Sequence, residues 1–144
     1  MLKEEELVYM SGETAEKGDC ENLRKLLKKG VSSRVKDYAI RWASQTGKKE
    51  AVSILLEEGA NPNAGLIFAV AYNQPEILQQ LIKAGADVNL YDAEAVKWAI
   101  KRGYAGILKI LFDAGAKPNK HDALKLAKKY GDKNIIELIE ENLA

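Results

Sequence analysis

The 144-residue sequence predicts an all-α protein, a solenoid of five helix–turn–helix repeats. Similar turns recur along the chain, and the apolar residues between them follow the period of a helix. No segment shows the strict polar–apolar alternation of a half-buried strand. We therefore expect ten helices in five antiparallel pairs and no sheet.

Two turn positions define each repeat. Glycine closes the first four repeats, at positions 30, 59, 85 and 115. Twelve residues before each of these lies a second turn residue, and the same register extends to a fifth. These mid-repeat positions are Gly18, Gly47, Asn73, Gly103 and Gly131. Their spacings of 29, 26, 30 and 28 residues, with a constant offset inside each unit, are typical of stacked repeats.

The turn residues have a conformational reason. A two-residue connection between helices needs a residue with positive φ, which glycine adopts freely and asparagine tolerates next best. We expect the closing glycines to be left-handed helix caps. Pro75 falls at the first helical position, where its missing N–H costs nothing. Asn63, Asp92 and Asn119 precede predicted first helices, and we expect each to be an N-cap.

The predicted repeats cover residues 1–32, 33–61, 62–89, 90–119 and 120–144 in one domain. In the second helices the apolar residues cluster on one stripe, as in 51–56, 77–82, 107–112 and 135–139. The first helices show the same period, as at Ala39, Ile40 and Ala43. Each helix therefore has one face to bury against its neighbours.

The segments 73–78 and 81–89 resemble the second helix and the closing turn of an ankyrin repeat. The match recurs at 47–56 and extends over essentially the whole chain. Ankyrin repeats span about 33 residues and open with Thr-Pro-Leu-His, which is absent here. The missing residues lie where the family has its β-hairpin fingers, so we expect an ankyrin-like stack without fingers. A tetratricopeptide array is disfavoured, because its aromatic pattern and ~34-residue period are absent.

The composition excludes several classes of protein. With 47% hydrophobic and 30% charged residues, the chain is neither disordered nor membrane-spanning, and its first residues do not suggest a signal peptide. The single cysteine, Cys20, fits a reducing compartment, and we expect a cytoplasmic protein. Cys20 lies at a predicted helix start, where a thiolate could be stabilised, but a small half-buried side chain is the simpler interpretation.

No catalytic constellation is evident in the sequence. The single histidine, His121, lies at the start of a predicted helix, and no cysteine lies near it in sequence. The cluster of about four ligands that a structural zinc site needs is therefore absent. There is no phosphate-binding glycine loop and no nucleophile elbow. We therefore expect no catalytic residue, no cofactor and no metal, and a protein that is not an enzyme.

Three aromatic residues, Trp42, Phe68 and Trp98, occupy equivalent positions five residues before a mid-repeat turn. They either fill the core between repeats or present their edges as binding anchors. The residues just before each turn vary from repeat to repeat, which fits either a recognition surface or solvent-exposed helix ends. The candidates among them are Gln45, Thr46, Tyr72, Lys101, Arg102, Lys129 and Tyr130.

Positive charge is concentrated near the C-terminus. Residues 97–133 hold ten basic and three acidic side chains, a local charge of +7. These lysines either keep the last two repeats soluble or form a binding patch, and we include Lys97 among the candidate partner-binding residues. The ankyrin resemblance implies a concave first-helix surface that binds another protein, here one with an acidic surface. Such a protein could be an adaptor or an inhibitor, including a viral or phage inhibitor of a host protein. The alternative is nucleic-acid or polyanion binding through the basic patch, which the missing aromatic platform disfavours. A designed scaffold is disfavoured by the irregular spacings.

Overall fold

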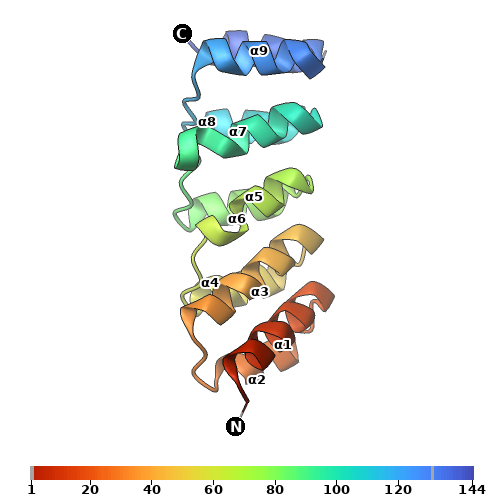
Figure 1. The fold of residues 1–144 in the computed structure, drawn as a ribbon, viewed down its shortest axis with the longest axis vertical. Coiled ribbons are helices and arrows are strands. Elements are labelled where there is room, and N and C mark those ends of the chain that lie inside the picture. Colours follow the sequence, from red (N-terminus) through yellow and green to blue (C-terminus); the bar gives the residue numbers. More distant parts are fainter. Residues whose placement is uncertain (1, 131) are drawn as a thin grey trace. The chain divides into compact units, whose positions relative to one another are not determined.

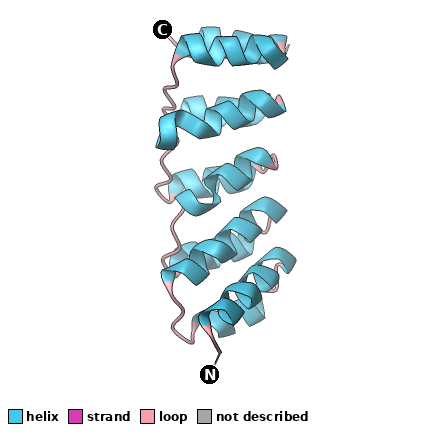
Figure 2. Cartoon of the chain, in the orientation of Figure 1, coloured by secondary structure: helices cyan, strands magenta, loops and turns pink. Residues whose placement is uncertain are grey.

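The structure, a computed structural model, describes residues 2–130 and 132–144 and shows ten helices and no strand among them (Figures 1 and 2). The predicted all-α architecture and the absence of β-hairpin fingers are therefore confirmed for the described residues. The chain divides into two compact units, Met1–Ala86 and Asp87–Ala144.

Unit 1 contains three helix pairs. Their bounds are α1 Glu4–Lys17, α2 Cys20–Leu27, α3 Ser33–Thr46, α4 Lys49–Glu57, α5 Asn63–Ala71 and α6 Pro75–Lys83. The first helices α1, α3 and α5 pack in one layer, and the second helices α2, α4 and α6 pack in the other (Figure 1).

Unit 2 contains two helix pairs with the same arrangement. Their bounds are α7 Leu90–Arg102, α8 Ala105–Asp113, α9 Lys120–Tyr130 and α10 Lys133–Asn142. Helix α7 packs on α9, and α8 packs on α10. In both units, each helix buries one apolar stripe against its pair and against the next repeat.

The mid-repeat turns have the predicted left-handed conformation. The φ angles are 70° at Gly18, 74° at Gly47 and 71° at Gly103. Asn73 takes the same role with φ 53°. In each case the next residue's N–H donates back to a carbonyl of the preceding helix, as from Gln74 to Ala69 at 2.8 Å. This closure satisfies carbonyl groups that a helix end leaves unpaired.

The closing glycines of four repeats are left-handed as well, with φ between 77° at Gly30 and 105° at Gly85. The residue after Gly59, Gly85 or Gly115 is an alanine whose N–H donates to the last turn of the second helix at 2.9–3.0 Å. The fifth predicted turn residue, Gly131, lies outside the described residues.

The N-cap predictions have mixed outcomes. The Asn119 side chain accepts the Asp122 N–H at 2.9 Å, which confirms it as the cap of α9. Pro75 is the first residue of α6, also as predicted. The prediction for Asn63 is wrong, because the helix already includes it and its own N–H donates to the Asn61 side chain. The residue at the N-cap position is Pro62, which makes no side-chain capping bond.

The N-cap prediction for Asp92 is also wrong. Tyr91, Asp92 and Ala93 all have left-handed backbone angles, with φ of 51°, 57° and 56°, so right-handed helix begins only after Ala93. The Ala93 N–H donates to the Asn89 carbonyl at 3.1 Å, which closes this left-handed turn. L-residues in this region cost about 1–2 kcal/mol each, so the turn is strained.

The core consists of aliphatic side chains in both units. The largest fully buried ones in unit 1 are Leu23, Ile40, Leu55, Leu66, Ile77, Leu78 and Leu81. Those in unit 2 are Ile100, Ile107, Leu108, Leu111 and Ile135. Alanines such as Ala39, Ala43 and Ala69 are completely buried on the first helices, which lets these helices approach closely.

Two glycines with free space around them test the conformational role of the closing turn. Gly115 has φ 94° and Gly106 lies in α8, and no atom would contact a Cβ added at either position. We expect Gly115→Ala to reduce the free energy of unfolding by about 1–2 kcal/mol, because alanine is strained at positive φ. Gly106→Ala should instead stabilise by about 0.5–1 kcal/mol. Urea denaturation measures both, and equal effects would contradict the left-handed cap.

Candidate functional site

Trp42 and Phe68, on α3 and α5 of unit 1, are both half-buried. The Trp42 ring packs edge-on against Tyr38, with ring centroids 6.3 Å apart and planes at 68°. Gly12 of α1 lies beneath the Tyr38 ring, since a Cβ there would come within 2.6 Å of it. The rings therefore contribute to packing and also present an edge to solvent.

Arg41 joins the aromatic side chains of unit 1. Its guanidinium carbon lies 4.6 Å from the Phe68 ring centroid and 5.8 Å from that of Tyr38, while the residue as a whole is exposed. It thus bridges α3 and α5. The sequence analysis missed Arg41, although it directly precedes Trp42. We call Tyr38, Arg41, Trp42 and Phe68 the arginine–aromatic cluster.

The helix ends beside this cluster are tied together by hydrogen bonds. Thr46 Oγ1 donates to the Trp42 carbonyl at 2.7 Å, and Gln74 Nε2 donates to the Gln45 carbonyl at 3.0 Å. The first bond lies within α3, and the second joins the end of α3 to the turn after α5 through the Gln45 backbone. Tyr72, in contrast, is 50% exposed directly after α5.

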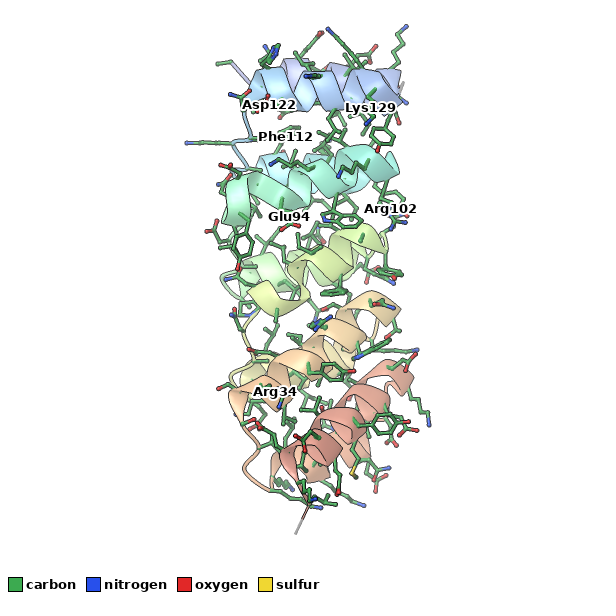
Figure 3. All side chains as sticks on the ribbon, viewed as in Figure 1. Arg34, Glu94, Arg102, Phe112, Asp122 and Lys129 are labelled. Carbon is green, nitrogen blue, oxygen red and sulfur yellow. The ribbon has the colours of Figure 1, made fainter. Side chains whose placement is uncertain are left out.

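Trp98 of unit 2 is half-buried on α7, as its counterparts are in unit 1. The Arg102 guanidinium lies 5.5 Å from its ring centroid, in the last turn of the helix (Figure 3). Lys129 Nζ lies 5.9 Å from the Tyr130 ring in the last turn of α9, and Tyr130 is 50% exposed. Each of these predicted residues therefore belongs to a cation–aromatic pair on its own helix.

Unit 2 also carries a groove of about 810 Å³ between α7 and α9. Its lining includes Lys97 and Lys101, which are exposed one helical turn apart, together with Asp92 and Asp122. Lys129 and Tyr130 are not part of this lining. The predicted basic residues thus form two sets, one along the groove and one at the end of α9.

A second groove, of about 670 Å³, lies beside the arginine–aromatic cluster in unit 1 and is lined by Arg34, Asp37 and Arg41 among others.

Ion pairs distinguish the two units. The five between described residues are Lys17–Glu13, Arg24–Glu50, Lys25–Glu21, Arg34–Glu4 and Lys49–Glu76, all in unit 1. Within the described part of unit 2, no lysine or arginine forms one. Its basic side chains are therefore available to carboxylates from outside the chain.

No group of three histidine, cysteine or acidic side chains in the described part of the chain could hold a metal ion. His121 is an exposed residue in the first turn of α9, which Asn119 caps. No helix among the described residues is long and apolar enough to cross a membrane.

Cys20 begins α2 as predicted, but its environment does not stabilise a thiolate. Desolvation raises the pKa of the thiol, and the negative charge of the nearby Glu50 carboxylate raises it further. The helix start therefore does not activate this cysteine. It is a half-buried side chain, which agrees with the simpler of the two interpretations.

Alkylation by iodoacetamide as a function of pH tests this environment. We expect the midpoint for Cys20 to lie above that of free cysteine, and Glu50→Gln to lower it by removing a negative charge. Glu21→Gln, on the same helix, should leave the midpoint unchanged. A midpoint below that of free cysteine would show a stabilised thiolate instead.

Comparison with known proteins agrees with this geometry. The family model for ankyrin repeats (3 copies) matches residues 12–92 and 66–143. The mouse (Mus musculus) inactive serine/threonine-protein kinase TEX14 is 30% identical over 105 residues, which cover 63% of this chain and 7% of that protein. The chain therefore spans a small part of the length of this relative. Since the family model covers most of the chain, the protein belongs to the ankyrin repeat family.

Proposed function

We propose that this chain binds a partner protein through side chains of its first helices, with the arginine–aromatic cluster as the principal contact in unit 1. Ankyrin repeats are generally protein–protein interaction modules and are typically non-catalytic. The observation that carries the proposal is Arg41, exposed and in contact with both Phe68 and Tyr38. Arginine, tyrosine and tryptophan are the residues that most often dominate binding energy at interfaces.

The geometry of the cluster supports this role. Arg41 lies on one repeat and Phe68 on the next, so their contact fixes both side chains before any partner arrives. A side chain that is already ordered loses less conformational entropy on binding. The half-buried rings then offer an apolar edge beside a cation whose hydrogen-bond donors face solvent.

Such a module acts either as an adaptor or as an inhibitor that covers an enzyme, including a viral or phage inhibitor of a host protein. Both modes use the same surface. Cytoplasmic localisation belongs to this proposal, and the single cysteine fits it. Nucleic-acid binding is the weaker alternative, because Asp92 and Asp122 lie beside the groove lysines and would repel a polyanion.

Substitution of two exposed arginines in unit 1 tests the proposal. Arg41 lies on a first helix, and Arg24 lies on the second helix α2, where it pairs with Glu50. Proteins captured by the immobilised chain from its native cell lysate are identified, and their affinity is measured with purified protein. We expect Arg41→Ala to weaken the affinity at least tenfold, or about 1.4 kcal/mol, as at an interface hot spot. Arg24→Ala should leave it within twofold.

Circular dichroism on both variants verifies that the fold is retained. Equal loss of binding in the two variants would contradict recognition by the first helices. Retention of full affinity by Arg41→Ala would exclude the arginine–aromatic cluster as the principal contact.

A further inference from the structure

We infer that the groove between α7 and α9 binds an extended acidic segment of a partner protein, with one apolar side chain on the groove floor. This inference rests on the proposed function, because it takes the ligand to be a protein. It adds the chemistry of the segment that is recognised and the place where it binds.

The floor of the groove is apolar and lacks bulk. Ala93, Val96 and Ile100 line it from α7, and Ala123 and Leu126 line it from α9. The two alanines are 2% and 4% exposed and fill little space, while Leu126 is half-buried. A volume of about 810 Å³ lies within the range of ligand-binding pockets and exceeds what one side chain needs.

The strained start of α7 contributes to this space. Because Tyr91, Asp92 and Ala93 form a left-handed turn, the right-handed helix starts at Glu94, one residue later than an N-cap at Asp92 predicts. On the opposite side, Lys117 and Pro118 approach α9 without a β-hairpin finger above them. The mouth of the groove therefore remains open to an incoming chain.

Basic and acidic side chains both line the groove, at different places along it. Lys97 and Lys101 lie along α7, and Lys117 lies in the connection before α9. None of these three ammonium groups forms an ion pair within the described chain. Asp92 and Asp122 lie in the first turns of their helices, at the same end of the groove as Lys117, whereas Lys97 and Lys101 lie further along α7 (Figure 3 labels Asp122). The groove thus offers cations beside its apolar floor and carboxylates at one end.

The spacing fits an extended peptide. From Ala93 to Lys101 the helix rises roughly 12 Å, the length of about four extended residues. Lys97 and Lys101 are one turn apart, so their side chains start about 5–6 Å from each other. Alternate residues of an extended chain lie on one side and about 6.6 Å apart, so acidic residues two positions apart can reach both lysines. A neighbouring apolar side chain can then contact Leu126, which is half-buried on the groove floor.

A nucleic acid fits this groove less well. No aromatic side chain lines it, so bases would have no surface on which to stack. Its two aspartates would also face a uniformly anionic backbone. A peptide avoids both problems, because its charge is confined to particular side chains.

The test uses the 144-residue chain and three fluorescein-labelled peptides in polarisation titrations at low salt. The probe is Ser-Gly-Leu-Glu-Ser-Glu-Gly-Ser, and its controls replace both glutamates by lysine or the leucine by alanine. We expect the probe to bind at least tenfold more tightly than either control, and added salt to weaken its binding. Equal affinity for the glutamate and lysine peptides, or no binding of the probe, would overturn the inference.

A matched pair of charge reversals locates the site. Lys97→Glu with Lys101→Glu changes the groove, while Lys125→Glu with Lys128→Glu makes the same change about one turn apart on α9, at exposed positions outside the groove lining. We expect the first pair to weaken probe binding at least tenfold and the second to change it less than twofold. Equal effects of the two pairs would show general charge attraction and overturn the assignment.

A single-stranded DNA of twelve nucleotides is the remaining probe. We expect it to bind more weakly than the acidic peptide at physiological salt. If the DNA binds more tightly than the acidic peptide, and Lys97→Glu with Lys101→Glu abolishes that binding, the ligand of the groove is a polyanion and the peptide inference is overturned. The inference can fail while the proposed function stands. If Arg41→Ala loses partner capture and the peptide does not bind, the chain still binds a partner protein through unit 1, and only the groove assignment is rejected.

Discussion

A backbone constraint underlies this protein: the chain must reverse direction twice per repeat within two or three residues. Each reversal needs a residue with positive φ, and eight such residues in the described chain stand at the predicted positions, seven of them glycines and one Asn73. With the reversals in place, two short helices lie side by side and their apolar stripes meet those of the next pair. The burial of residues such as Leu55 and Leu108 follows from this arrangement.

The short connections between repeats have a structural consequence of their own. In unit 2, Asn89 replaces the missing hairpin contacts, because its side chain donates to the Gly115 carbonyl and accepts the Lys117 N–H at 2.7 Å. These two bonds join successive repeats through one side chain. The connection therefore stays ordered although it is short, and it leaves the mouth of the α7–α9 groove uncovered.

The two units use charge in different ways. In unit 1, basic side chains pair with carboxylates of the same or a neighbouring helix, and such exposed pairs add little to stability. In unit 2, the groove lysines have no internal partner. Cations that are not neutralised internally attract an acidic partner from a distance and increase its association rate. We therefore propose that recognition in unit 1 depends on the arginine–aromatic cluster, and that recognition in unit 2 depends on charge and an apolar floor.

By itself the sequence determined the all-α fold, the order of the helices and the left-handed turns, because local periodicity and glycine placement encode all three. It also identified Asn119 as a cap, since this depends on neighbouring residues only. The tertiary structure decided which residues far apart in the sequence come into contact. Arg41 meets Phe68 across two repeats, and the groove arises where alanines of α7 and α9 face one another. Neither contact has a local signal, and the left-handed turn at Asp92 opposes the local preference, so only packing between repeats could reveal them.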